Sequence, residues 1–289
     1  LIRNQTGLKQ PVNLIEDCAV APNDLPAYVT DIQALLAKHH VQAAFYAHAG
    51  AGELHIEPFL DIHSPEGKTL FRKLLTETVE ILKKYKGSLS GEHGDGRLRG
   101  EFIPQIMGDE IYQLFVEIKQ LFDPQNILNP GKIVHSPPMD EAFRQKEKQE
   151  PANYYFHYPE TESPLGLAEK CSGSGDCKKT ALTGGTMCPS FMASQKEKDS
   201  TRGRANILRQ LITESGSEAY SNPELLEILD LCLSCKGCQT ECPSGVDMAK
   251  LKAETLQQHY DKQGIPWRTK MVGHFPILQR LASYVAPLY

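Results

Sequence analysis

A run of four closely spaced cysteines near residue 240 limits what this chain can fold into more than any other feature. The run reads Cys232-x2-Cys235-x2-Cys238-x3-Cys242-Pro243. Three thiolates at intervals of three residues can bind one iron–sulfur cluster, and in two-cluster ferredoxins the fourth cysteine of such a run binds the other cluster. Zinc sites usually use two separated cysteine pairs instead. The run therefore favours an iron–sulfur domain over a structural zinc site or unliganded thiols.

An upstream group of cysteines has a related spacing. Cys171, Ser174 and Cys177 repeat the interval of three, and Cys188 precedes a proline as Cys242 does. If two clusters exchange the cysteines that precede proline, one site has four thiolates and the other is one thiolate short. The first set is Cys188, Cys232, Cys235 and Cys238, and the second is Cys171, Cys177 and Cys242 with Ser174 in the fourth place. We expect a [4Fe–4S] cluster at the first. The second leaves open a three-iron cluster, a four-iron cluster with a non-thiolate ligand, or no cluster.

Composition narrows the class of protein further. Seven of the 8 cysteines lie beyond residue 170, which is unlike a disulfide framework and indicates a reducing compartment. The remaining Cys18 is interpreted as a small buried apolar side chain. The net charge of −5, without a stripe of Lys and Arg, argues against a nucleic-acid partner. The sequence contains no apolar run of about 20 residues, which is the length that would predict a transmembrane segment.

Two domains and a linker are expected from the patterning. Residues 1–135 mix strand and helix signals without a strict βαβ rhythm, which predicts an α+β domain with an antiparallel sheet and flanking helices. Residues 136–164 are rich in proline and charge and predict a linker. Residues 165–289 predict an all-α, ferredoxin-like iron–sulfur domain. The elements expected are strands over 12–20, 41–46 (buried) and 54–59, and helices from Asp24, from Ser64, over 110–122, 202–213, 223–231 and 246–260.

Histidine and glutamate motifs form a second constellation in the first domain. His48 and His55 flank a glycine-rich stretch that lets the backbone fold tightly, so the two imidazoles can converge. Glu92 can add a carboxylate to the same divalent ion, which gives two histidines and one carboxylate with open positions for a substrate. His93 is then available as a base. The alternative is that these are ordinary polar side chains.

Several motifs resemble a known family. The segment from Pro11 to Val134 resembles the C-terminal domain of FAD-linked oxidases of the vanillyl-alcohol-oxidase type, and most closely that of D-2-hydroxyglutarate and D-lactate dehydrogenases. The segment from Cys171 onward resembles the iron–sulfur part of large bacterial members and the iron–sulfur subunit of glycolate oxidase. The first resemblance rests on Glu16-Asp17, His48-x-Gly-x-Gly-x-Leu-His55, Ser90-Gly-Glu-His-Gly-Asp-Gly96 and Phe122-Asp-Pro-x-Asn-Ile-Leu-Asn-Pro-Gly-Lys132.

The resemblance implies roles for these motifs. His48, His55 and Glu92 would bind a divalent metal, usually zinc, and His93 would be the catalytic base. Many relatives have an acidic residue and an asparagine where this chain has Ala51 and Glu53, which leaves the identity of the metal open. FAD would sit mainly on a preceding domain that this sequence does not resemble, so the chain is interpreted as a fragment of a larger polypeptide.

Four further residues are candidates for substrate or cofactor contacts. Arg97 and Arg99 can pair with a substrate carboxylate, and the alternative for them is a surface ion pair. Asn129 and Lys132 are predicted to approach the flavin, and the alternative for them is a turn that stops a helix.

The sequence as a whole predicts part of a flavin-dependent dehydrogenase. Its substrate would be a D-2-hydroxy acid such as D-2-hydroxyglutarate or D-lactate, and electrons would pass from FAD to the iron–sulfur clusters and then to a quinone or a soluble carrier. The alternative is a non-catalytic electron-transfer or assembly module with a structural metal. We expect this chain alone to be inactive, the full-length protein to be a homo-oligomer, and its location to be the cytoplasm, at most peripheral to the inner membrane face.

Overall fold

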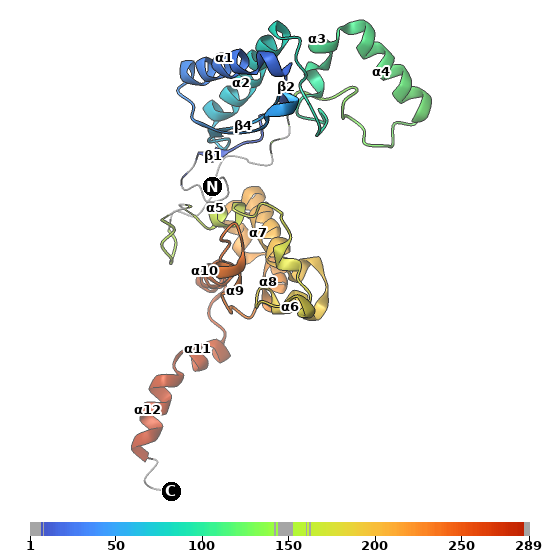
Figure 1. Cartoon of the computed structure of the whole chain (residues 1–289). Coiled ribbons are helices and arrows are strands. Elements are labelled where there is room, and N and C mark those ends of the chain that lie inside the picture. The colour runs from blue at the N-terminus through green and yellow to red at the C-terminus, as the bar shows by residue number, and fades with distance from the viewer. Residues whose placement is uncertain are drawn as a thin grey trace. The chain divides into compact units, whose positions relative to one another are not determined.

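Two compact units make up the chain, residues 1–147 and residues 148–289. The computed structural model describes residues 7, 9–141, 143, 153–159, 161 and 163–285 (Figure 1). Each unit has its own apolar core. The predicted fold class, an α+β unit with an antiparallel sheet followed by a helical unit, is confirmed.

The first unit combines one small sheet with helices. Its elements in chain order are β1 (Gln10–Pro11), β2 (Ile15–Ala19), α1 (Leu25–Lys38), β3 (Ala43–His48), β4 (Glu53–Leu60), α2 (Pro65–Lys84), α3 (Ile103–Met107) and α4 (Asp109–Phe122). Short 3-10 turns precede α1, join β3 to β4 and precede α3. The predicted helices from Asp24, from Ser64 and over 110–122 correspond to α1, α2 and α4.

Strand β4 is the centre of the sheet. It pairs antiparallel with all of β3, and its residues Glu53, Leu54 and Ile56 also pair with β2. The two residues of β1 extend the pairing at the far end of β4. The expectation of a buried strand over 41–46 is wrong, because every residue of β3 is intermediate or exposed. Among the described strands β3 has a single neighbour, so its outer edge and one face meet solvent.

The core of this unit lies between the sheet and two helices. Figure 1 shows α1 and α2 side by side against the sheet, and their buried residues form one cluster with Leu54 and Ile56 of β4. Because side chains alternate along a strand, Glu53, His55 and Glu57 point to the opposite face. That polar face is where the candidate ion site forms. Cys18 is buried in the core, as expected for a small apolar side chain.

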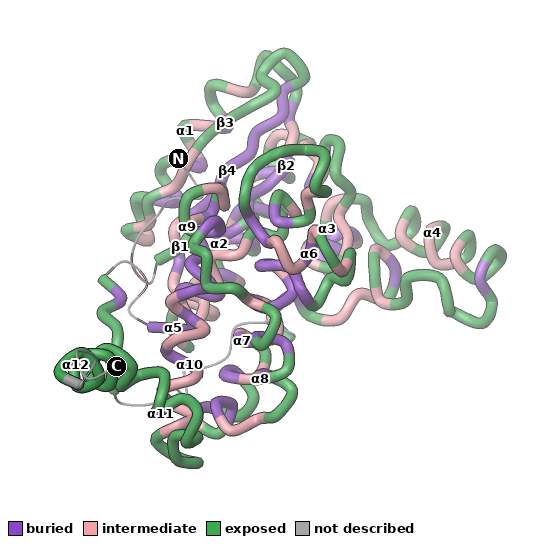
Figure 2. The backbone as a smooth tube through the Cα atoms, turned by 90° about the horizontal axis from the view of Figure 1, so that it is seen from below, coloured by how far each residue is buried: buried purple, intermediate pink, exposed green. Residues whose placement is uncertain are grey.

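The cap of α2 follows its sequence signal, whereas Asp24 before α1 forms no side-chain cap hydrogen bond. Ser64 accepts a hydrogen bond from the N–H of Gly67 at the start of α2, and Pro65 occupies the first turn. In contrast, α4 has no buried residue although its apolar side chains recur at helical spacing (Figure 2). Its stability in the described part of the chain therefore rests on local interactions more than on burial.

The second unit consists of α-helices, 3-10 turns and loops, with no strand among its described residues. Its elements are α5 (Pro164–Glu169), α6 (Pro189–Ser194), α7 (Thr201–Ser215), α8 (Pro223–Asp230), α9 (Gly237–Glu241), α10 (Met248–Gln263), α11 (Trp267–Gly273) and α12 (Phe275–Val285), with 3-10 turns at 176–178, 181–183, 197–199 and 216–221. The predicted helices over 202–213, 223–231 and 246–260 correspond to α7, α8 and α10. The core is built around α5, α7 and α10, and the residues of α11 are exposed (Figure 2).

Both ends of the segment predicted as a linker pack onto the units. Met139 is buried in the core of the first unit, and Asp140 pairs with Arg72 at 2.7 Å. Tyr158 is buried in the core of the second unit, where the N–H of Phe156 donates to Glu254. Most of the charged run over 141–150 lies outside the described residues.

Glycine at position 52 is required by the turn between β3 and β4. Gly52 has a φ of +76°, and a Cβ placed there would lie 1.9 Å from the carbonyl oxygen of Val20. We expect Gly52→Ala to lower the free energy of unfolding by about 2 kcal/mol or more, measured by denaturant titration. Gly50→Ala is the matched control, because nothing lies within 4 Å of its Cβ position. Equal effects of the two substitutions would contradict this account.

Candidate functional site

The hairpin of β3 and β4 brings together three side chains of the candidate ion site. His48 at the end of β3 lies opposite Glu53 at the start of β4. His55 is two residues beyond Glu53 and shares its face of the strand. The Nε2 atom of His55 is 3.4 Å from Oε1 of Glu53. The tight turn therefore does bring the two predicted imidazoles together, with ring centroids 5.3 Å apart.

A loop after α2 supplies the other side chains. Oε1 of Glu92 lies 3.6 Å from Nε2 of His48 and 3.9 Å from Nε2 of His55. His93 follows, with Nε2 at 3.1 Å from the same oxygen of Glu92, and its ring stacks on that of His55. The loop has little regular structure of its own, so it depends on an external anchor.

Asp17 is that anchor. A bulge interrupts β2 between Ile15 and Cys18, and Asp17 has a φ of +70° within it. Its carboxylate accepts hydrogen bonds from the N–H groups of Glu92 at 2.8 Å and His93 at 2.9 Å, from that of Gly91 at 3.1 Å, and from the hydroxyl of Ser90. Burial by itself raises the pKa of Asp17, but these hydrogen bonds outweigh it and lower the pKa to about 2.

Glu16 orients the central histidine. Its Oε1 lies 3.0 Å from Nδ1 of His55, which directs the other ring nitrogen toward Glu53 and Glu92. A carboxylate partner on one imidazole nitrogen is the usual support for a histidine that binds metal through the other. The bulge thus gives consecutive acidic residues two separate roles, since Glu16 faces the histidine and Asp17 faces the loop.

The residues present fit a divalent metal ion. Candidate ligand atoms of His48, Glu53, His55 and Glu92 all lie within 4.8 Å of one another. Oε1 of Glu53 is buried without a hydrogen-bond partner in the described structure. Burial raises the pKa of Glu53, and a hydrogen bond with the carboxyl of Asp17 raises it further. Imidazole and carboxylate groups at this spacing suit zinc, manganese or iron.

The sequence interpretation gave no role to Glu16 and none to Glu53. Only Glu53 carries a local signal that could have been used. It stands two residues before His55, directly before the strand predicted over 54–59, and in an extended segment it would share the face of His55. Glu16 precedes an acidic residue within a predicted strand, and such a pair can face one site only through a bulge, which is not readable from local spacing.

Arg99 does not lie where a substrate could reach it. Its guanidinium is buried and donates to the carbonyl oxygens of Glu16, Leu89 and Gly94. It thus ties the loop to β2, which corrects the expectation of a substrate contact or a surface ion pair. Arg97 is exposed and is the arginine of the two that a ligand can reach.

Asn129 and Lys132 lie in the turn that follows α4. Asn129 has a φ of +49°, and the Lys132 ammonium donates to its side-chain oxygen at 3.3 Å. This is the turn role given as their alternative. Both side chains are exposed, and their contact with flavin stays a prediction.

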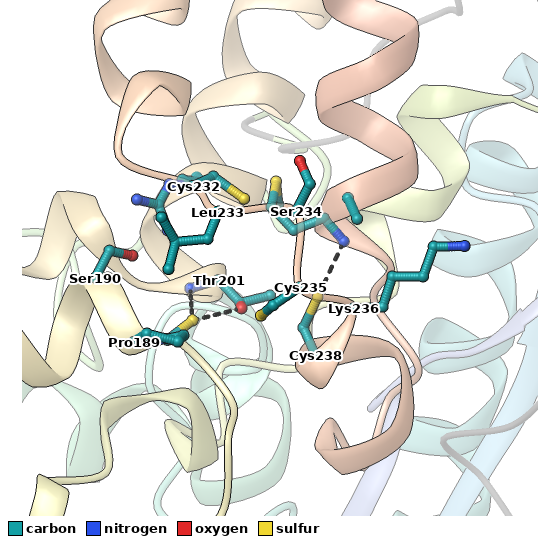
Figure 3. Close-up of a pocket in the computed structure, with 13 residues that line it drawn as sticks. Pro189, Ser190, Thr201, Cys232, Leu233, Ser234, Cys235, Lys236 and Cys238 are labelled. Atoms are coloured by element: carbon teal, nitrogen blue, oxygen red, sulfur yellow. Dashed lines mark hydrogen bonds between the residues drawn. The ribbon is translucent and has the colours of Figure 1, made fainter. Parts of the chain in front are cut away.

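The second unit gathers the cysteines around two pockets. One pocket is lined by the whole of the first predicted set, Cys188, Cys232, Cys235 and Cys238. Figure 3 shows three of them around the pocket with Thr201. The other pocket is lined by the second predicted set, Cys171, Cys177, Cys242 and Ser174. Each pocket is thus lined by one predicted set, and the two sets meet where Cys188 of the first contacts Cys177 of the second.

Backbone N–H groups at helix starts point to these sulfurs. Those of Thr201 and Arg202, the first residues of α7, donate to Cys188 at 2.9 Å and Cys177 at 3.3 Å. The N–H of Met248, the first residue of α10, donates to Cys238 at 3.3 Å. Helix N-termini stabilise negative charge, so these contacts favour thiolate and cluster ligands. Hydrogen bonds from Cys188 and from the N–H of Arg202 lower the pKa of Cys177 against the effect of burial.

Two further charged residues form hydrogen bonds with backbone groups near the cysteines. Arg204 lines the first pocket, is 1% exposed, and donates to the carbonyls of Asp199 and Ile228. Glu241 accepts hydrogen bonds from the N–H groups of Thr186 and Met187, next to Cys188. Hydrogen bonds from Thr186 first, and then from Met187, lower the pKa of Glu241 to about 2.

Comparison with known proteins defines the class of each domain. Residues 2–133 match the family described as "FAD linked oxidases, C-terminal domain", and residues 170–247 match a "4Fe-4S dicluster domain". The chain therefore carries an FAD-linked oxidase C-terminal domain followed by a 4Fe–4S dicluster domain. The second match spans all seven clustered cysteines.

Individual relatives cover most of the chain. A D-2-hydroxyglutarate dehydrogenase of Escherichia coli is 27% identical over 94% of this chain and 30% of its own length. One of Haemophilus influenzae is 28% identical over 99% of this chain and 31% of its own length. A D-lactate dehydrogenase of Archaeoglobus fulgidus is 32% identical over 44% of this chain and 28% of its own length. The chain thus spans less than a third of each of these relatives.

Within the described residues, no helix combines the length and the apolar character needed to cross a membrane.

Replacing Asp17 with Asn tests the anchor. Asparagine tolerates a positive φ, so the substitution removes mainly the charged acceptor. The folded pKa of about 2 lies below the ordinary 3.8, so the stabilisation is present above about pH 4 and is lost as the pH falls toward 2. We expect Asp17→Asn to cost about 2 kcal/mol at pH 7, with the difference from wild type narrowing at acid pH. The exposed Asp24→Asn is the control; a pH-independent difference would contradict the account.

Iron analysis tests the separation of the cysteine sites. We expect the anaerobically purified chain to hold about eight irons if both sites are filled by four-iron clusters. Cys177→Ser should remove iron from one site and Cys238→Ser from the other, each leaving about half, with distinct electron paramagnetic resonance spectra. Cys18→Ala should leave the iron content unchanged. Loss of all iron in either single variant would argue against independent sites, and fewer than three irons in the wild type would argue against clusters.

Proposed function

We propose that this chain forms the ion-binding and electron-relay part of a flavin-dependent dehydrogenase that oxidises a D-2-hydroxy acid to the 2-oxo acid. The observation that carries the proposal is the half-open cluster of His48, Glu92 and His93 over a buried His55. The side chains of His48 and Glu92 are 62% and 48% exposed, whereas that of His55 is 4% exposed. A structural metal site is normally closed, and a catalytic one keeps positions for substrate. The half-open geometry therefore favours catalysis over the alternative of a structural ion.

The roles of the ligands follow from their positions. His48, His55 and Glu92 would hold the divalent ion, for which zinc was the expectation. When bound, such an ion polarises the hydroxyl and carboxylate of a 2-hydroxy acid and makes the hydroxyl more acidic. Glu16 keeps His55 in one orientation, and Asp17 keeps Glu92 on the site through the loop.

His93 would take the hydroxyl proton. It is half-exposed beside Glu92, and its Nδ1 lies 3.6 Å from Glu16. A carboxylate near each ring nitrogen can stabilise the protonated imidazole after the transfer. Arg97, exposed five residues after Glu92, is the candidate for holding a substrate carboxylate.

Cofactors and partners complete the proposal. FAD would be held mainly by a flavin-binding domain that acts with this chain, with Asn129 and Lys132 close to it, and would supply the acceptor for the hydride from C2 of the substrate. Cys188, Cys232, Cys235 and Cys238 would hold one cluster for electron relay, and Cys171, Cys177 and Cys242 would hold a second. The match to a dicluster domain supports both clusters. The final acceptor is a quinone or a soluble carrier.

The names of the relatives support D-2-hydroxyglutarate or D-lactate as the substrate. We propose a homo-oligomer in the reducing cytoplasm, at most peripheral to the inner membrane face. The clustered free cysteines support a reducing compartment.

Substitution of His93 tests the catalytic role. In a polypeptide that joins this chain to its flavin-binding domain, we expect His93→Ala to lower kcat by about 100-fold or more while flavin and iron contents stay unchanged. His274→Ala, an exposed histidine of the second unit, is the control. Anaerobic bleaching of the flavin by D-2-hydroxyglutarate and by D-lactate measures the step. Wild-type turnover in His93→Ala would refute the assigned base, and activity of the present chain with added FAD would refute the need for the flavin domain.

A further inference from the structure

Glu53 occupies a position that the three-residue ion site does not explain. It pairs with His48 across the hairpin and shares a strand face with His55. Its side chain is 6% exposed, and its Oε1 has no hydrogen-bond partner in the described structure. A buried carboxylate oxygen without a partner is costly, so it is a candidate ligand where other ligand atoms lie around it.

The surroundings of that oxygen point to a cation. Oε1 of Glu53 lies 3.4 Å from Nε2 of His55, whose other nitrogen already faces Glu16. Ligand atoms of Glu53, His48, His55 and Glu92 all fall within 4.8 Å of one another. We propose that Glu53 is a fourth protein ligand of the ion, which makes the site one of two histidines and two carboxylates. This inference rests on the ion site of the proposed function and extends it.

A fourth protein ligand changes which ion can serve catalysis. Zinc in proteins is usually tetrahedral, so four protein ligands would leave it without an open position. An ion that takes six ligands keeps two positions, enough for the hydroxyl and carboxylate oxygens of a 2-hydroxy acid. Carboxylates also suit harder ions such as Mn²⁺ better than they suit zinc, and two of them balance the ion's double charge. The site therefore takes a six-coordinate ion of the Mn²⁺ class in its active form.

The same strand provides a matched control. Glu57 lies on the same face of β4, is 5% exposed as Glu53 is, and has one buried oxygen without a hydrogen-bond partner. Its other oxygen accepts a hydrogen bond from Tyr46 at 2.9 Å, and it is outside the group of four. Neutralising a buried carboxylate therefore affects both variants, whereas loss of an ion ligand affects only Glu53→Gln.

Mn²⁺ binding tests the assignment. The complete chain is purified anaerobically with its clusters in place, so that the thiols are occupied, and is titrated with Mn²⁺ while electron paramagnetic resonance follows the free ion. We expect one Mn²⁺ per wild-type chain, an affinity at least about 10-fold weaker in Glu53→Gln and Glu92→Gln, and a change under about threefold in Glu57→Gln. We also expect Glu53→Gln to prefer Zn²⁺ over Mn²⁺ more strongly than the wild type does, because the remaining ligands favour zinc. Competition between the two ions measures this preference, and Zn²⁺ should displace Mn²⁺ from the variant at a lower concentration than its weaker Mn²⁺ affinity accounts for.

Each outcome has a separate meaning. Wild-type Mn²⁺ affinity in Glu53→Gln with weak binding in Glu92→Gln would overturn the fourth ligand and leave the three-residue site intact. No binding by the wild type, or wild-type affinity in Glu92→Gln, would overturn the ion site itself and with it the proposed function. An unchanged preference between Mn²⁺ and Zn²⁺ in Glu53→Gln would overturn the assignment of the ion. If Glu53→Gln does not fold, by circular dichroism, Glu53→Asp replaces it, because the shorter side chain keeps the charge and withdraws the oxygen.

Discussion

The carboxylate of Asp17 is the interaction on which the ion site depends. It accepts four hydrogen bonds from the loop that carries Glu92 and His93, three from backbone N–H groups and one from Ser90. The bulge in β2 makes this possible, because it turns Asp17 to the loop while Glu16 faces His55. Arg99 reinforces the arrangement from inside by binding carbonyls of β2 and the loop. Without this carboxylate the loop would lose the four side-chain hydrogen bonds that help to fix Glu92 and His93 relative to the hairpin.

The two units stabilise negative charge by the same physical means. In the first unit, successive N–H groups of a loop surround a carboxylate. In the second, the N–H groups at the starts of α7 and α10 meet cysteine sulfurs. The N–H groups of the first two residues of α7 each donate to a sulfur in a different pocket. The start of this one helix therefore contacts both candidate cluster sites.

Much of the local structure was predictable, and the failures have identifiable causes. Helices α1, α2, α7 and α8 follow from apolar periodicity and from proline and capping residues, which act within one or two turns. The burial of β3 was mispredicted because an apolar run does not reveal whether a strand lies at the sheet edge. Arg99 was assigned to substrate because a guanidinium can pair with a carboxylate on two atoms, whereas its side chain turns inward.

The sequence by itself determined the cysteine spacing that separates two ligand sets, and the histidine and glutamate motifs of the first domain. These properties depend on residues close together in the chain, whose geometry is set by local backbone conformation. Tertiary structure alone decided that Glu16 supports His55, that Asp17 holds the loop, and that Glu92 joins the hairpin residues as a candidate ligand. These contacts depend on strand register and on a bulge, which arise from pairing between distant segments and therefore leave no local signature in the sequence.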